Sequence, residues 1–238
     1  MTAEFAKTHP DIELSPVAVG TGQAIELGKR GDADVLLSHD SVAEMQLVNG
    51  GQAVSRANVM YNDFVIAGPP NSGSETCVGA SEAMKAIATN RASFVSRGDD
   101  SGTHRKEKML WRELGIDSDT ITADWYVRAG VGMGDALLLA GQKHAYILTD
   151  RGTYLRFAKR VDLDVTCEND SRLLNTYGVT VMKGDRRIAA AEFARWITSE
   201  DVQRLIGEFG RKEFGRSLFM PYANGAASHD TIPTGERR

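Results

Sequence analysis

The sequence predicts an α/β fold in which helices cover both faces of largely parallel sheets. Short apolar runs typical of buried strands alternate, almost throughout, with segments that repeat their apolar residues at a helical period. Several of these runs enter a glycine-rich turn that opens a helix. The 238 residues, 42% hydrophobic and 25% charged, suffice for one two-lobed unit or two small domains.

The charge and the hydropathy pattern exclude two kinds of partner. A net charge of −4 gives no basic field for nucleic acid. No apolar run approaches the ~18 residues of a membrane helix, so we expect no direct insertion into a membrane. A ligand of this chain would be held by local groups rather than by net charge.

The expected strands are short and apolar, and the expected helices have an amphipathic period with polar caps or terminal glycines. The strands are Ser15–Val19, Ala33–Leu37, Val59–Ala67 (interrupted by Asn62-Asp63), Phe94-Val95, Trp125–Val127, Tyr146–Leu148, Val161–Thr166 and Tyr177–Met182. The helices are a segment before Pro10, Gln23–Lys29, one ending at Val48, Ser81–Thr89, one ending at Gly115, Ala136–Ala140, Thr153–Ala158, Ile188–Thr198 and Glu200–Glu208. We expect a loop at Asn71–Gly79 and a loose tail at Asn224–Arg238.

The most informative pattern is a strand that leads through a polar turn into a helix. Phe94-Val95 ends the strand, Ser96–Gly102 forms the turn, and the helix follows. The first amides of a helix lack carbonyl partners and, with the helix dipole, form a site for a small anion. Arg97 adds a forked cation. Three side chains add hydroxyl donors, namely Ser96, Ser101 and Thr103. We call residues 96–103 the cradle.

Other interpretations of the cradle stay open. Asp99 and Ser101 are common N-cap residues, and most helices carry such caps without a ligand. Ser101 with His104 and an aspartate suggests a hydrolase, and Asp100 with His104 has the spacing of two metal ligands. Neither has the supporting context of a GxSxG, HExxH or CxxC motif, so we predict no catalytic residues and no metal site.

A second turn of the same kind lies near the N-terminus. Gly20-Thr21-Gly22 follows an expected strand and opens the helix Gln23–Lys29. It is therefore a second possible anion-facing helix start, although a routine tight turn would have the same sequence.

The motif SRGDDSGTH at 96–104, followed by a helix with a tryptophan, resembles the tungstate-specific solute-binding proteins of bacterial and archaeal ABC importers. The resemblance covers nearly the whole chain in the family's order. It continues through Val19–Asp40, Met60–Pro69, Gly130–Leu137 and Tyr146–Leu155. The combination of SRGDDSGTH with TDRGTYL is specific, whereas SGT alone also fits phosphate binders.

The resemblance implies a two-lobed periplasmic-binding-protein-like fold of type II, hinged by crossover segments near Phe64–Gly68 and Leu174–Gly178. Lobe one is then 1–67 with 177–238, and lobe two is 68–176. In the family a strand and a Thr/Ser-rich loop precede the first helix. This N-terminal strand is missing here, as is a signal peptide, so we expect a truncated chain or a gene with a miscalled start.

The resemblance also implies that the protein captures tungstate, with molybdate close behind, in a cleft between the lobes. A tetrahedral dianion offers only acceptor oxygens, so its site needs donors all round and no inward carboxylate. The implied ligand-binding residues are Ser96, Arg97, Ser101, Gly102, Thr103, Gly132, Met133, Gly134 and Thr149 in lobe two, and Gly20, Thr21 and Gly22 in lobe one. Asp99, Asp100 and Asp150 are expected to cap helices or to orient Arg97.

The implied partners are a small inorganic oxyanion and the membrane permease of an ABC importer. The implied location is periplasmic or extracytoplasmic, and neither a cofactor nor catalysis is expected. The alternatives are a phosphate- or sulfate-type binder, a cytosolic oxyanion sensor, and a serine or metal hydrolase. Cys77 and Cys167 fall in the same predicted lobe, where they can pair in an exported protein or stay reduced in the cytosol.

Overall fold

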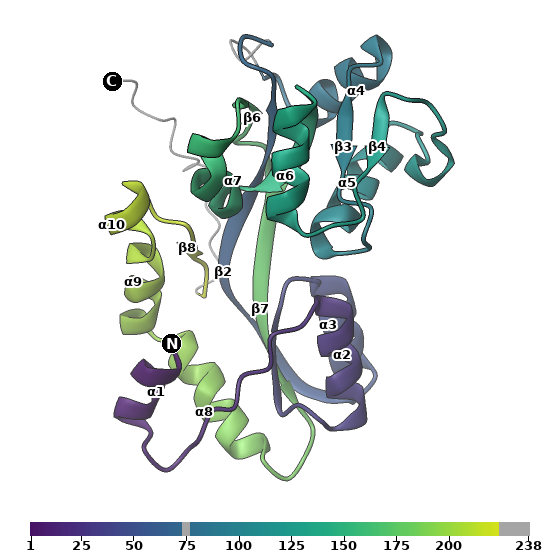
Figure 1. The fold of residues 1–238 in the computed structure, drawn as a ribbon. Coiled ribbons are helices and arrows are strands. Elements are labelled where there is room, and N and C mark those ends of the chain that lie inside the picture. The colour runs from purple at the N-terminus through teal and green to yellow at the C-terminus, as the bar shows by residue number, and fades with distance from the viewer. Residues whose placement is uncertain (73–76, 224–238) are drawn as a thin grey trace. The chain divides into compact units, whose positions relative to one another are not determined.

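A computed structural model describes residues 1–72 and 77–223 of the chain (Figure 1). The chain divides into two compact units, one of them discontinuous. Unit 1 is Met1–Tyr61 with Thr176–Arg238, and unit 2 is Asn62–Asn175. The action of two such parts as hinged lobes, with boundaries after Ala67 and Thr176, stays a prediction.

Unit 1 is built on three neighbouring strands in the order β1-β7-β2, with β8 also paired to β2. Its elements are α1 (Thr2–Thr8), α2 (Thr21–Arg30), β1 (Val35–Ser38), α3 (Ser41–Asn49), the first part of β2 (Ala53–Gly68), most of β7 (Leu174–Met182), α8 (Arg187–Ile197), α9 (Glu200–Glu208), α10 (Arg211–Phe214) and β8 (Met220–Pro221). Phe5 of α1 and Trp196 of α8 pack with Val59 of β2 in one buried group. Leu36 and Leu47 anchor β1 and α3 in a second group.

Unit 2 is built on the strand order β2-β5-β3-β4, with β6 also paired to β2. Its helices and remaining strands are α4 (Ala80–Asn90), β3 (Phe94–Ser96), α5 (Gly102–Glu113), β4 (Tyr126–Arg128), α6 (Met133–Gln142), β5 (Tyr146–Asp150), α7 (Arg151–Phe157) and β6 (Asp164–Cys167). Single 3-10 turns lie at Ser118–Thr120, Ala158–Arg160 and Ser171–Leu173.

Alternation along β3 places helices on both faces of the unit 2 sheet. Phe94 packs edge-on against Trp111 of α5, with 5.2 Å between ring centroids. The next residue, Val95, packs with Leu137 of α6 in a different buried group. Because successive side chains of a strand point to opposite faces, α5 and α6 cover opposite faces of the sheet. The predicted α/β class is confirmed.

The sheets are mixed, which corrects the expectation of largely parallel sheets. In unit 2, β3 runs parallel to β4 and to β5. However, β2 is antiparallel to β5 and β6, and β7 is antiparallel to β1. The chain passes from one unit to the other within β2 and within β7. These two strands run opposite to the neighbours named above, so the sheets are mixed.

Three expected elements differ from the structure. Ser15–Val19 is not a strand; it pairs with no strand of the described residues, and Val17 is 72% exposed. β2 begins at Ala53 and runs through Asn62-Asp63 without interruption. β5 continues beyond the predicted end at Leu148, so Thr149 and Asp150 belong to the strand and not to the turn that opens α7. The expected tail, and residues 73–76 of the expected loop, lie outside the described residues.

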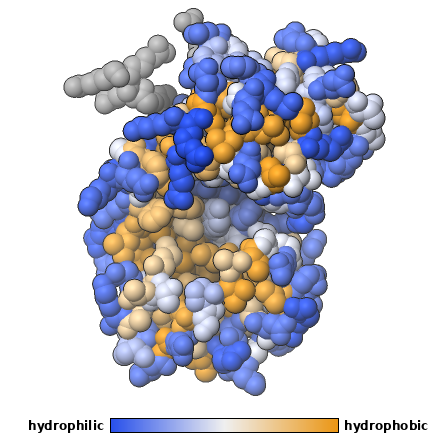
Figure 2. Space-filling model, in the orientation of Figure 1, coloured by the Kyte–Doolittle hydropathy of each residue, from blue (hydrophilic) through white to orange (hydrophobic). Residues whose placement is uncertain are grey.

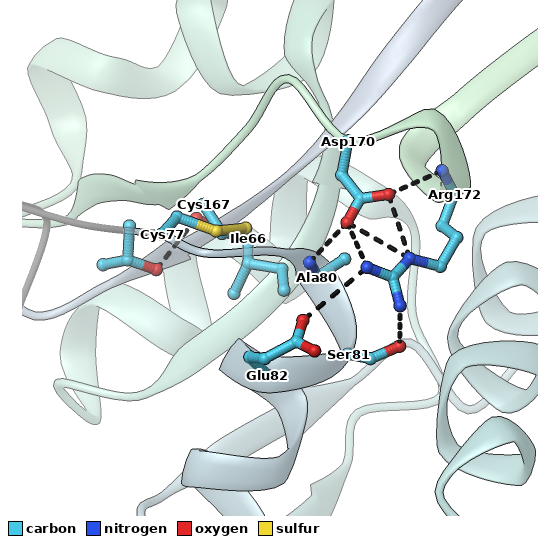
Figure 3. The surroundings of a disulfide bond; sticks show 9 residues. Ile66, Cys77, Ala80, Ser81, Glu82, Cys167, Asp170 and Arg172 are labelled. Carbon is cyan, nitrogen blue, oxygen red and sulfur yellow. Dashed lines mark hydrogen bonds and ion pairs between the residues drawn. A yellow bond between two sulfur atoms is a disulfide. The ribbon is translucent and has the colours of Figure 1, made fainter.

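Cys77 and Cys167 form a disulfide within unit 2, with 5.1 Å between their Cα atoms (Figure 3). The bond joins the segment before α4 to the end of β6. Of the two alternatives that the sequence leaves open, the structure has the paired one.

The visible face carries many hydrophilic residues with apolar residues among them (Figure 2). Among the described residues, no helix combines the length and the apolar character that crossing a membrane requires.

Candidate functional site

Three helices of unit 2 begin at one edge of its sheet. β3, β4 and β5 run parallel, and each is followed directly by a helix: α5, α6 and α7 respectively (Figure 1). The carboxyl ends of parallel strands meet at the same edge, so the three helix N-termini also meet there. Each of these N-termini carries amides without intrahelical partners and the positive end of a helix dipole.

Strand register and turn hydrogen bonds bring the predicted donors together at this edge. Phe94 of β3 pairs with Tyr146 of β5, and Val95 pairs with Ile147, so the two parallel strands run toward the same edge. On the other side, the amide of Ala129 donates to the carbonyl of Ser96 at 2.9 Å. The amide of Gly130 likewise donates to the carbonyl of Arg97 at 2.8 Å, which ties the cradle to the loop that opens α6.

The start of α5 has a capped first turn. Ser101 is the N-cap; its Oγ accepts the His104 amide at 3.4 Å, and its own amide donates to Asp99 Oδ1 at 3.2 Å. The amides of Gly102 and Thr103 lie in the first turn, where a helix supplies no carbonyl. No backbone carbonyl of the described residues accepts from either amide, so both remain available to a ligand.

Arg97 is held at the edge of the cradle by an ion pair with Asp99. Its side chain is 17% exposed, and its Nε is buried without a hydrogen-bond partner among the described residues. Partial burial acts to raise the pKa of Asp99, but hydrogen bonds from Ser101 and the charge of Arg97 outweigh it and lower that pKa. Asp99 is therefore ionised at neutral pH. It contacts both Arg97 and Ser101, as expected of a residue that orients Arg97.

The side chains of Ser101 and His104, on which the hydrolase and metal interpretations rest, accept hydrogen bonds from backbone amides. His104 Nδ1 accepts the amide of Asp100 at 2.9 Å, and Ser101 Oγ bonds the backbone rather than the ring of His104. Burial and the charge of Lys108 lower the pKa of His104, so its ring is neutral at pH 7. Within residues 1–72 and 77–223, no three His, Cys, Asp or Glu side chains gather as a metal site requires.

The turn before α6 contributes backbone rather than side chains. Gly132 is the exposed N-cap and has no side-chain cap, so nothing competes with a ligand for the first amides of α6. Met133 is 9% exposed and packs in the core. A Cβ on Gly134 would lie 2.6 Å from Phe157, so this glycine permits α6 to pack closely against α7.

Two predicted groups belong to elements other than the cradle. Thr149 lies inside β5, fully buried, and its hydroxyl donates to the Asp150 carbonyl at 3.2 Å. Asp150 caps α7 by accepting the amide of Thr153 at 2.8 Å, as expected of a capping residue. Gly20, Thr21 and Gly22 belong to unit 1, where Gly20 is the exposed N-cap of α2 and makes no side-chain cap.

Pattern reasoning misses two buried charged groups near this edge. Glu107 of α5 is 1% exposed and accepts hydrogen bonds from Tyr126 and Trp111. Arg151, in the first turn of α7, is 5% exposed and pairs with Asp63. For Glu107 a signal exists, because it stands four residues after Thr103 and four before Trp111, on the buried stripe of the helix.

Comparisons with known proteins give a consistent family. Residues 1–201 match the family model described as PBP superfamily domain. The chain is 45% identical to the tungstate-binding protein TupA of Peptoclostridium acidaminophilum over 232 residues, 92% of this chain and 79% of that protein. Among solved structures, the tungstate binding protein TupA from Desulfovibrio alaskensis G20 is 36% identical with a TM-score of 0.84, covering 93% of this chain and 91% of that one. The tungstate ABC transporter structure from Geobacter sulfurreducens is 39% identical with a TM-score of 0.72, covering 87% and 89%.

Proposed function

Because the chain belongs to the TupA family of tungstate-binding proteins, within the PBP superfamily, we propose that it is the solute-binding component of an ABC importer. Its cargo in this proposal is tungstate, with molybdate as the alternative of equal charge and similar size. The protein binds the oxyanion without changing it chemically and hands it to a membrane permease.

One observation supports the oxyanion proposal above others: the donors of unit 2 gather at a single sheet edge, where no backbone carbonyl of the described residues accepts from the amides of Gly102 and Thr103. The amides of Gly102 and Thr103, the exposed helix start at Gly132 and the guanidinium of Arg97 all belong to this edge. Charge-assisted hydrogen bonds contribute roughly 1.5–3 kcal/mol each, so a few of them suffice for tight binding of a dianion. Hydroxyls of Ser96, Ser101 and Thr103, and the Gly20–Gly22 turn of unit 1, are further proposed donors.

An exported location is part of the proposal. The Cys77–Cys167 disulfide supports it, because disulfides persist in oxidising compartments and are rare in the cytosol.

The test is calorimetric titration of the protein with tungstate, molybdate, sulfate and phosphate. We expect tungstate and molybdate to bind at least tenfold more tightly than sulfate or phosphate. The Arg97→Ala variant loses the forked cation and should bind tungstate at least tenfold more weakly. Arg105→Ala, which removes an equal charge from an exposed position of α5, should change the affinity less than threefold.

Two outcomes would contradict the proposal. Equal affinity of Arg97→Ala and the unsubstituted protein would remove Arg97 from the site. Preference for phosphate or sulfate over tungstate would assign the chain to the runner-up class of binder.

A further inference from the structure

A buried carboxyl group lies directly behind the cradle. Glu107 extends from α5 toward β3 and β4 and is 1% exposed. Its Oε1 accepts the Tyr126 hydroxyl of β4 at 2.5 Å and the Trp111 indole N–H at 3.2 Å. The backbone of Arg97 also adjoins this carboxyl and acts to lower its pKa. Glu107 therefore joins the peptide on which the cradle begins to the helix that supplies its amides.

The Ser96 hydroxyl completes the surroundings of Glu107. Ser96 is fully buried, and it interacts with both Glu107 and Tyr126. Its Oγ nevertheless has no partner with good hydrogen-bond geometry among the described residues. This hydroxyl can donate to an ionised carboxylate or accept from a protonated carboxyl. Its orientation thus depends on the charge of Glu107.

A titratable group, the Tyr126 phenol, hydrogen-bonds directly to Glu107. Tyr126 faces it from β4; burial and the negative charge of Glu107 raise the pKa of Tyr126, so the phenol stays neutral. Burial raises the pKa of Glu107 to about 7, against hydrogen bonds from Tyr126, Ser96, Trp111 and the Arg97 amide that lower it. Both forms of the carboxyl are consequently populated near neutral pH.

Resting on the proposed function, we propose that Glu107 is a positioning residue of the oxyanion cradle: it fixes the Ser96–Arg97 peptide from behind and takes up a proton from solvent when the dianion binds. A dianion in front of this peptide repels a carboxylate behind it and favours the protonated form. Binding then raises the pKa of Glu107 further, and above pH 7 it must draw a proton from solvent. Affinity accordingly falls as the pH rises through the pKa of the free protein.

The test measures how many protons the protein takes up when it binds tungstate. Tungstate is titrated into the protein at pH 7.5 in two non-oxyanion buffers of different ionisation enthalpy, which gives the number of protons taken up per anion. We expect a positive value below one, and an affinity about five- to tenfold weaker at pH 8 than at pH 6.5. In Glu107→Gln, which keeps the size and an acceptor but does not titrate, the uptake should vanish and the affinity should change less than twofold over this range.

Two further variants separate this role from a structural one. Tyr126→Phe removes a hydrogen bond that favours the ionised carboxyl, so the midpoint of the pH dependence should move upward. Glu113→Gln changes a carboxyl at an exposed position of the same helix and should leave the proton count unchanged. His104 is retained in every variant, so uptake that persists in Glu107→Gln would belong to His104 and would overturn the inference.

The outcomes distinguish the two proposals. Tungstate binding without proton uptake, or with the same pH profile in Glu107→Gln, overturns the role of Glu107 and leaves the proposed function standing. Absence of tungstate binding at every pH overturns the proposed function itself. If Glu107→Gln does not fold, the proton count of the unsubstituted protein and the midpoint of Tyr126→Phe decide.

Discussion

Arg151 is a buried cation that holds three parts of unit 2 together. Its side chain is 6% exposed; its Nε contacts the two carboxylate oxygens of Asp63 at 2.8 and 2.9 Å, and its Nη1 lies 2.6 Å from Glu168. These partners come from β2 and from the residue after β6. Burial alone would lower the pKa of Arg151, but the two carboxylates raise it, so the guanidinium stays charged.

Removing this cation should destabilise the protein markedly. In Arg151→Met the carboxylate of Asp63 is left partly buried without its partner, and we expect a loss of about 2–4 kcal/mol in the free energy of unfolding. The estimate lies below that for a fully buried pair because Glu168 is 40% exposed. Urea denaturation measures the loss. Arg105→Met, which breaks an exposed pair, should cost less than about 1 kcal/mol, and equal losses in the two variants would refute the assignment.

Single residues were predictable where backbone chemistry requires a particular residue type. Ser101 and Gly102 are residue types that favour a helix start, and Ser101 is the N-cap of α5 in the structure. Glu107 and Arg151 are different, because a charged residue on a helix is ordinarily placed on the solvated face. The partner of Arg151 stands 88 positions away in the sequence, which no local pattern reveals.

Helix α4 depends for its start on a side chain distant in the sequence. Its N-cap, Gly79, offers no side-chain oxygen; instead Asp170 accepts the amide of Ala80 at 2.7 Å (Figure 3). Arg172 pairs with the same carboxylate at 2.7 Å. Burial opposes ionisation, yet hydrogen bonds from Arg172 and the Ala80 amide outweigh it and lower the pKa of Asp170 to about 2.

This cap should contribute to stability in a pH-dependent way. Because the folded-state pKa is depressed, the contribution is fully present above the ordinary aspartate pKa of about 3.9 and is lost as the pH falls toward 2. Asp170→Asn should therefore reduce the free energy of unfolding at pH 6 by about 1–2 kcal/mol, which lowers the thermal midpoint. The difference from the unsubstituted protein should shrink between pH 4 and pH 2. A difference that stays constant over this range would show that the carboxylate charge is irrelevant.

Elements with their own terminal signals were predictable, and elements that depend on distant pairing were not. Helix α2 ends at Arg30, one residue beyond the predicted Lys29, and its C-cap Gly31 has a left-handed conformation with φ of 81° that suits glycine. The segment Ser15–Val19 has the composition of a strand, but within residues 1–72 and 77–223 it pairs with no strand. The first part of β2 includes the polar residues Ser55, Arg56 and Asn58, so its place in a sheet follows from the neighbouring strand β7 rather than from hydropathy.

At the scale of the molecule, the Cys77–Cys167 bond closes a loop with a sequence separation of 90 residues, which spans most of unit 2. A crosslink of this length restricts the unfolded chain, and we expect its removal to cost about 2–4 kcal/mol. Urea denaturation with and without a thiol reductant measures the cost. The Cys77→Ser/Cys167→Ser double variant should match the reduced protein and should not respond to the reductant. An unchanged midpoint on reduction would contradict the prediction.

The architecture as a whole was predictable from strand–helix alternation and from the order of the family motifs. The direction of β2 and β7 was not, because a hydropathy pattern has the same form in parallel and antiparallel strands. Only the registers of β1 with β7 and of β2 with β5 establish it.

The discontinuity of unit 1 has a consequence for biosynthesis. On the ribosome, β1 and β2 emerge more than a hundred residues before β7, the strand that lies between them in the sheet. Phe5 likewise emerges long before Trp196, against which it packs at a ring-centroid distance of 5.2 Å. Until translation passes α8, the early half of unit 1 presents unpaired strand edges and uncovered apolar side chains, the surfaces on which nascent chains aggregate and to which chaperones bind. Unit 2 is continuous in sequence, so all of its partners emerge within one shorter stretch of the chain.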